Sequence, residues 1–216
     1  MTNLEDARFA AESGVDALGF IFYPKSPRYI RPERAREIIR KLPPELVKIG
    51  VFVNDDTRYI KEIMTRCGLN FVQLHGHESP AYCRYFPESV IIKALSPRTE
   101  EDLRIVEHYR ARAILVDTYA PEKYGGTGKR SNWKLAGKIR GSRQLILSGG
   151  LNTENIGRAI EEVSPHAVDI NSGVEKAPGK KDRELVVRIV GLIRRAERVH
   201  DDKQMKIFDI NAGHNN

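Results

Sequence analysis

Two short runs near the C-terminus have the residue types of a phosphate-binding site. Residues 145–152 and 167–175 each begin with an apolar, β-prone stretch, continue into small residues and are followed by a helical pattern. The small residues of interest are Gly149, Gly150, Ser172 and Gly173. Small residues let backbone N–H groups approach a ligand closely, and a following helix start adds a partial positive charge. Either run alone could be an ordinary turn, but together, at the ends of adjacent strands, they favour a phosphate site.

Asp117 is the candidate general acid of the sequence. It follows four apolar residues at a predicted strand end, where partial desolvation could raise the pKa of its carboxyl enough for acid catalysis near neutral pH. The alternative is a carboxylate that caps a loop or pairs with Lys123 or Lys129. The sequence leaves both possibilities open.

Three further polar side chains lie at or after strand ends. Gln73 and His75 end one apolar run, and His75 could hydrogen-bond a substrate or make a purely structural bond. Arg28, in a loop stiffened by two prolines, could bind a carboxylate bidentately or simply be solvated. Residues 125–129 (Gly-Gly-Thr-Gly-Lys) resemble a phosphate cradle but lack the first Gly and the Ser/Thr of a P-loop. We therefore expect a loop that covers the substrate.

The elements that must position these residues alternate strictly between strand and helix. Apolar runs predict strands at 17–23, 47–53, 71–75, 90–95, 113–118, 144–148 and 167–170. Helical patterns occupy 2–13, 32–42, 55–67, 80–86, 100–110, 133–139, 153–163 and 182–198. This alternation predicts an α/β fold with a parallel sheet and outer helices, the (β/α)₈ or TIM barrel. Because the chain begins with a helix, the first strand of such a barrel is missing, leaving seven strands and eight helices.

Composition bounds the remaining possibilities. The 216 residues suit one domain at 1–198, followed by a polar tail at 199–216, in which 205–210 could form a short strand. Two distant cysteines and isolated histidines predict no disulfide framework and no metal site, and the cytoplasm is the expected location. No run is long enough for a membrane span. The net charge of +7 is spread over most helices, so we expect anionic small molecules rather than nucleic acid as partners.

Taken together, residues 1 to about 198 resemble the phosphoribosylanthranilate isomerases, the (β/α)₈ enzymes of tryptophan biosynthesis. The similar pieces are 19–22 with 26–29, 50–53, 72–76, 115–117, 125–128, 147–151 and 169–175. The resemblance implies a cofactor-free Amadori rearrangement of an aminoaldose to an aminoketose, with Asp117 as general acid and Arg28 on the anthranilate carboxylate. It also implies that Gly149, Gly150, Ser172 and Gly173 hold the phosphate, and that Gln73, His75, Gly126 and Gly128 contact the substrate.

One departure from the family concerns the catalytic base. The family's base is a Cys near the end of the first strand, in a run like Lys-Ile-Cys-Gly-Met-Thr, whereas this chain opens with Met1 and Thr2. Neither Cys67 nor Cys83 is placed to replace it. Three explanations are a start codon assigned too late, a true truncation that leaves an open barrel, or a permuted strand at 206–210 with Asp209 as substitute base.

Other functions compete with this assignment. Another phosphate-binding barrel of tryptophan or histidine biosynthesis is one alternative, and the indole-forming synthase would need a catalytic lysine, for which Lys93 is the nearest candidate. A non-catalytic, phosphosugar-binding remnant of the isomerase is another, because the base is absent. The sequence is compatible with a monomer or a homodimer.

Overall fold

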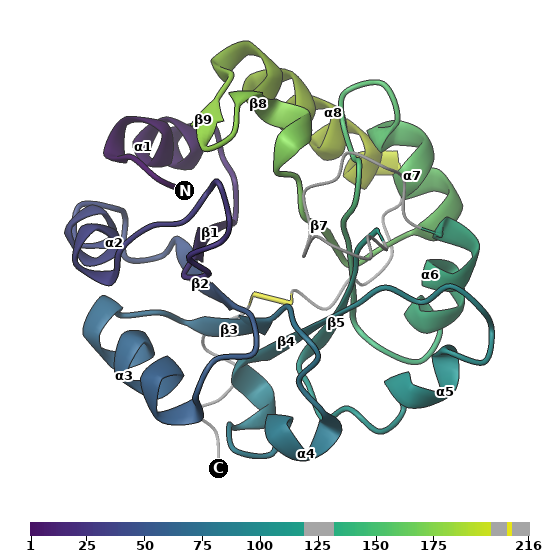
Figure 1. Cartoon of the computed structure of the whole chain (residues 1–216). Coiled ribbons are helices and arrows are strands. Elements are labelled where there is room, and N and C mark those ends of the chain that lie inside the picture. The colour runs from purple at the N-terminus through teal and green to yellow at the C-terminus, as the bar shows by residue number, and fades with distance from the viewer. Residues whose placement is uncertain (119–131, 200–206, 209–216) are drawn as a thin grey trace.

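Seven parallel strands form one curled sheet. The computed structural model of the chain describes residues 1–118, 132–199 and 207–208. Each strand pairs with the next in sequence order, and Figure 1 shows the sheet winding around a central axis with the helices outside. The strands are β1 (Ala17–Ile21), β2 (Val47–Phe52), β3 (Phe71–Leu74), β4 (Ile91–Leu95), β5 (Ala113–Val116), β6 (Leu145–Leu147) and β7 (Ala167–Val168). The predicted (β/α)₈-type sheet is confirmed.

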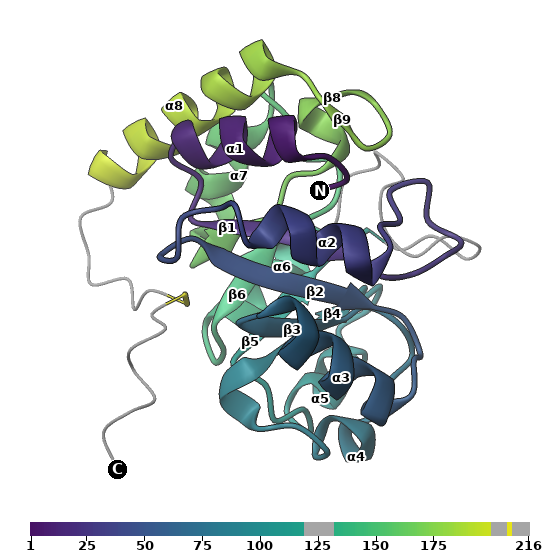
Figure 2. The same cartoon turned by 90° about the vertical axis from the view of Figure 1, so that its left-hand side faces the viewer.

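The helices cover the outer face of the sheet, as both views show (Figures 1 and 2). They are α1 (Leu4–Glu12), α2 (Pro32–Ile39), α3 (Thr57–Cys67), α4 (Pro80–Cys83), α5 (Leu103–Val106), α6 (Trp133–Arg140), α7 (Ile156–Val163) and α8 (Arg183–Val199). Side chains of Asn3, Asp56 and Ser79 cap α1, α3 and α4 by accepting backbone N–H groups. In the described part of the chain, every helix is too short or too polar to span a bilayer.

The structure departs most from the predicted elements in two places, although the helices predicted at 80–86 and 153–163 are also shorter than expected. The helix expected at 100–110 shrinks to α5, because the Asp102 carboxylate accepts the N–H groups of Arg98 and Thr99 in a turn instead. An antiparallel hairpin, β8 (Glu175–Ala177) and β9 (Lys180–Lys181), precedes α8 and was not predicted. Its turn contains Gly179 at φ +79°, a conformation that glycine adopts readily.

Alternation along the strands separates two apolar clusters. In β2 and β5, Val47, Ile49, Ala113 and Leu115 face the interior of the ring, and the residues between them face the helices. Such strands, buried on both faces, explain the nearly continuous apolar runs of the sequence.

Within the described residues, the ring is open between β1 and β7, each of which has a strand neighbour on one side only (Figure 1). The other edge of β1 meets a single bridge between Ile21 and Tyr29, and the Met1 ammonium, which donates to the Gly19 carbonyl. A sheet edge without a partner exposes unpaired backbone groups. No described segment takes the place of the missing first strand.

Two residues of the C-terminal tail fill the interior of the ring instead. Ile207 is 2% exposed and belongs to the interior cluster, and the ring of Phe208 meets that of Phe71 edge to face. Arg112, just before β5, donates from Nε to the Ile207 carbonyl over 3.2 Å. Ile207 and Phe208 form a turn. They do not support the permuted strand at 206–210, one of the three explanations above, although residues 206, 209 and 210 lie outside the described part of the chain. Asp209 lies outside the described residues.

We expect Ile207→Ala to lower the free energy of unfolding by about 2–4 kcal/mol, because it removes a buried side chain from an interior that cannot collapse around the gap. Ile207→Asp should cost more, because it places an unpaired carboxylate among apolar groups. Urea unfolding measures both changes.

The control for this prediction is Val187→Ala, which truncates an apolar side chain that is 56% exposed on α8. Its effect should stay within about 0.5 kcal/mol. An Ile207→Ala protein as stable as the Val187→Ala control would show that the tail does not contribute to the core.

Candidate active site

The interior face of the sheet becomes polar at the carboxyl ends of the strands. Phe71 of β3 lies in the interior apolar cluster, so Gln73 and His75, at steps of two residues, face the same way. By the same alternation, Leu115 of β5 directs Asp117 to the interior. Active sites of barrels of this kind lie at this end.

These three predicted residues are joined by hydrogen bonds. The Gln73 amide nitrogen lies 2.7 Å from His75 Nδ1, and His75 Nε2 lies 3.1 Å from Asp117 Oδ2. With the amide nitrogen donating, Nδ1 accepts, so Nε2 carries the imidazole proton and donates it to Asp117. The other Asp117 oxygen accepts the Thr118 N–H over 2.7 Å. Asp117, 5% exposed, therefore has a fixed orientation.

Asp169 is a second interior carboxyl, which the sequence analysis did not single out. It follows β7 as Asp117 follows β5, and Ser148 Oγ donates to it over 3.5 Å. Burial raises the pKa of Asp169, and the negative charge of Asp117 raises it further, while His75 and Lys181 act in the opposite direction. Its position directly after an apolar strand was the signal that could have identified it.

The two predicted phosphate runs lie against each other. Gly149 and Gly150 have φ angles of +89° and +65°, and a Cβ on Gly149 would lie 2.3 Å from Thr118 Oγ1. Ser172 and Gly173 fall in the 3₁₀ turn η2 (Ser172–Val174), where a Cβ on Gly173 would lie 1.9 Å from the Leu151 carbonyl oxygen. The turn after β6 thus packs against Thr118 after β5, and the turn after β7 packs against Leu151, so closely that only glycine fits at either contact.

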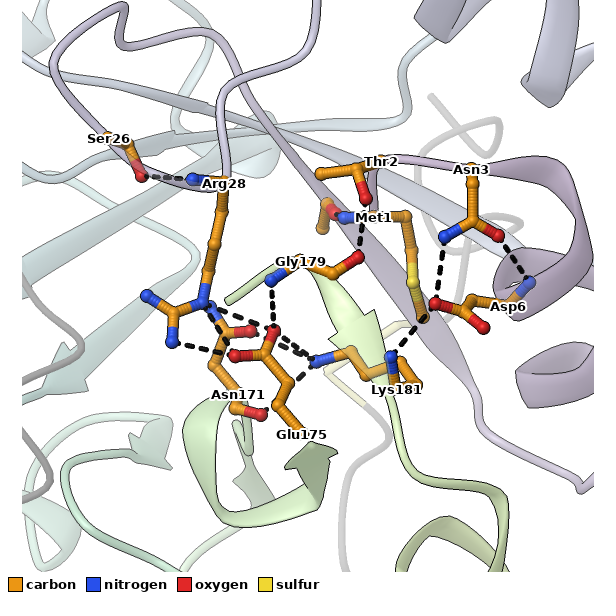
Figure 3. Close-up of polar contacts among 11 residues, drawn as sticks. Met1, Thr2, Asn3, Asp6, Ser26, Arg28, Asn171, Glu175, Gly179 and Lys181 are labelled. Atoms are coloured by element: carbon orange, nitrogen blue, oxygen red, sulfur yellow. Dashed lines mark hydrogen bonds and ion pairs between the residues drawn. The ribbon is translucent and has the colours of Figure 1, made fainter. Parts of the chain in front are cut away.

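Arg28 is buried in an ion pair, so the alternative that it is simply a solvated loop residue is wrong. Its guanidinium pairs with the Glu175 carboxylate, with Nε 2.9 Å and Nη2 2.7 Å from Oε2, as Figure 3 shows. The two side chains are only 11% and 4% exposed. The pair joins the loop after β1 to the first residue of β8.

Lys93 is excluded from the interior. Ile92 and Ala94 face the ring, so Lys93 faces outward, and its ammonium donates to the Glu78 carboxylate over 2.7 Å. It also donates to the carbonyls of Leu74 and Gly76 at 3.0 and 2.8 Å. The prediction that Lys93 could be the catalytic lysine of an indole-forming synthase is therefore wrong. Its role is to anchor the loop after β3 that carries His75.

The remaining predicted features have mixed outcomes. Cys67 and Cys83 are buried in the outer cluster, and burial raises the pKa of Cys83 to about 11, so neither supplies an interior thiolate. The described residues contain no group of three His, Cys, Asp or Glu side chains suited to a metal. Gly126 and Gly128 lie outside the described residues.

The sequence model for "N-(5'phosphoribosyl)anthranilate (PRA) isomerase" matches residues 1–191. An N-(5'-phosphoribosyl)anthranilate isomerase of Syntrophus aciditrophicus is 54% identical over 94% of this chain and 89% of that protein.

Two solved structures are similar. One shows monomers generated from the dimeric phosphoribosylanthranilate isomerase of Thermotoga maritima, with 43% identity and a TM-score of 0.80 over 90% of this chain and 95% of that one. The other is a phosphoribosylanthranilate isomerase in complex with reduced 1-(o-carboxyphenylamino)-1-deoxyribulose 5-phosphate, with the same identity, TM-score and coverage. With its curled sheet of parallel strands and this match over most of its length, the chain belongs to the N-(5'-phosphoribosyl)anthranilate isomerase family.

Proposed function

We propose that this chain catalyses the Amadori rearrangement of N-(5-phosphoribosyl)anthranilate to 1-(2-carboxyphenylamino)-1-deoxyribulose 5-phosphate, the isomerase step of tryptophan biosynthesis. The observation that carries the proposal is Asp117, held by His75 at the carboxyl end of the ring in a chain of this family. No cofactor takes part. The family match does not support the alternative of a non-catalytic phosphosugar-binding protein.

Asp117 is the general acid of this proposal. Its carboxyl protonates the ribose ring oxygen, the bond from C1 to that oxygen breaks, and the nitrogen lone pair forms the iminium. The hydrogen bond from His75 and the one from Thr118 fix both carboxyl oxygens, so the acid does not have to be oriented during the reaction. Gln73 acts through His75 by holding its tautomer.

A base then removes the proton from C2, and the resulting enolamine tautomerises to the ketone. The family resemblance assigns this base to a Cys whose run has no counterpart in residues 1–216. The turns that contain Gly149, Gly150, Ser172 and Gly173 bind the phosphate through backbone N–H groups. Arg28 binds the anthranilate carboxylate. Roles for Gly126 and Gly128 at the substrate, and a cytoplasmic location, stay predictions.

The proposed activity is tested by following the conversion of N-(5-phosphoribosyl)anthranilate by NMR. Residues 1–216 are compared with the same chain preceded by a strand that ends in Cys-Gly. We expect the aminoketose to accumulate with the extended chain. If both proteins are folded and neither converts the substrate, the proposed function is wrong.

In whichever form is active, Asp117→Asn should lower kcat by about 100-fold or more, since an amide cannot deliver the proton. KM should change little, because the amide keeps the shape of the side chain. The matched control is Asp16→Asn, which alters a surface carboxylate paired with Arg194 and should change kcat less than twofold. A wild-type kcat in Asp117→Asn would remove Asp117 as the general acid.

Gly173→Ala should weaken phosphate binding, because the added methyl must displace the η2 turn from Leu151. We expect the inhibition constant of inorganic phosphate to rise by about tenfold or more, the loss of roughly one charge-assisted hydrogen bond. Gly137→Ala in α6, where nothing lies within 4 Å of the new methyl, should leave it unchanged. Equal inhibition constants in the two variants would place the phosphate elsewhere.

Asp169→Asn should stabilise the protein at pH 7. In the native protein the pKa of Asp169 is raised above its ordinary value of 3.8, which applies to the unfolded chain. The free energy of unfolding of the wild type therefore falls as pH rises from about 4 towards the raised pKa. The variant lacks this carboxyl, so its advantage in urea unfolding should grow between pH 4 and 8. If the difference in free energy of unfolding between the variant and the wild type stays constant over that range, the raised pKa of Asp169 is contradicted.

Asp102→Asn provides a control of the opposite sign. The backbone N–H groups of Arg98 and Thr99 lower the pKa of this exposed carboxyl, so its charged form stabilises the native state above the unfolded pKa. The variant should therefore be less stable than the wild type at pH 7, and the difference should shrink as pH falls below about 4.

A further inference from the structure

Glu175 lies buried between two cations. Its Oε2 accepts Arg28 Nε and Nη2, and its Oε1 accepts Lys181 Nζ at 3.2 Å and the Gly179 N–H at 3.3 Å (Figure 3). Its side chain is 4% exposed and that of Lys181 is 9% exposed. The carboxylate thus receives donors from two segments of the chain, the loop after β1 and the hairpin at 179–181, and each donor restricts its orientation.

This arrangement fixes which edge of the Arg28 guanidinium is presented. The bonds to Glu175 use the edge formed by Nε and Nη2, and among the described residues Nη1 has no partner. In Figure 3 Nη1 points away from Glu175. Because the guanidinium is planar and rigid, fixing one edge also fixes the direction of the edge formed by Nη1 and Nη2.

The same carboxylate is linked to the predicted phosphate turn. Lys181 Nζ donates to the backbone carbonyl and the side-chain oxygen of Asn171, at 3.2 and 3.0 Å. Asn171 immediately precedes Ser172 and Gly173. Glu175 therefore connects, through one cation on each side, the loop after β1 with the turn after β7.

The hairpin that carries this network is itself anchored. Thr2 Oγ1 donates to the Gly179 carbonyl over 2.5 Å, and the Lys181 N–H donates to Asp6 Oδ2 over 2.9 Å. Both contacts tie β8 and β9 to the start of α1 (Figure 3). The position of Glu175 is thus set by the fold rather than by the two cations alone.

We propose that Glu175 is a specificity-determining positioning residue: it directs the remaining edge of Arg28 and thereby sets the ring position at which the site accepts the substrate's carboxylate. The inference rests on the proposed function, because it assumes that Arg28 binds that carboxylate. A second carboxylate at the free edge leaves the Glu175 pair intact, since a guanidinium has five N–H donors and can donate to two bidentate carboxylates.

The test compares two ligands of equal charge, reduced 1-(2-carboxyphenylamino)-1-deoxyribulose 5-phosphate and its 3-carboxyphenyl isomer. Their affinities for the full chain are measured by calorimetry. The wild type should prefer the 2-carboxy ligand by about tenfold or more, the effect of one well-placed charged hydrogen bond. In Glu175→Gln the preference should fall to about threefold or less.

The ratio of the two affinities is the informative quantity. Removing the negative charge of Glu175 strengthens the attraction of every anion, and a disturbed phosphate turn weakens both ligands, but neither effect changes the ratio. Glu175→Asp keeps the charge and shortens the side chain, so the affinity ratio should fall in this variant too. It replaces Glu175→Gln in the test if Glu175→Gln does not fold. Glu37→Gln, which neutralises a surface carboxylate paired with Arg34, is the control and should keep the wild-type ratio.

Arg28→Met separates failure of this inference from failure of the proposed function. A wild-type preference for the 2-carboxy ligand that is lost in Arg28→Met and in the Glu175 variants supports the positioning role. Loss in Arg28→Met with an unchanged ratio in the folded Glu175 variants overturns that role alone. If the wild type shows no preference, or Arg28→Met keeps it, Arg28 does not bind the carboxylate, and that part of the proposed function fails first.

Discussion

The site depends on one geometric constraint, the alternation of side chains along strands that curl into an open ring. Every second residue of a strand faces an enclosed interior, so a polar residue there must find a partner inside the ring. The apolar residues of β3 and β5 fill the lower part, and Gln73, His75 and Asp117 meet above them. The positions of the acid and its partner are therefore set by strand register, which is stiffer than any loop.

This constraint explains what could be predicted from the sequence. The strand order followed from apolar runs alternating with helical patterns, and Gln73, His75 and Asp117 were found because each ends such a run. Asp169 has the same position after β7, but the strand predicted at 167–170 extended past it, so Asp169 did not stand out as the end of a strand. The partners of Arg28 and Lys93 could not be predicted, because ion pairs between distant segments leave no local pattern.

Buried charges hold the loops around the site. Glu78 with Lys93, and Glu175 with Arg28 and Lys181, lie almost out of contact with water. Such pairs add little net stability, because desolvation opposes their attraction, but leaving one member unpaired is costly. The loops after β1 and β3 are consequently restricted to the arrangement in which every buried charge has its partner. In this protein the charged groups select a geometry, and the apolar clusters provide most of the stability.

The filling of the ring by Ile207 has a consequence for how the protein is made. Arg112 and Ile207, which are joined by a hydrogen bond, are 95 residues apart in the chain. A contact of this separation closes a long loop, and the loss of chain entropy on closure slows its formation. During synthesis the interior stays incomplete until Ile207 has left the ribosome, since chains emerge from the N-terminus. A nascent chain that is arrested after α8 therefore exposes the apolar starts of its strands to chaperones and to other nascent chains.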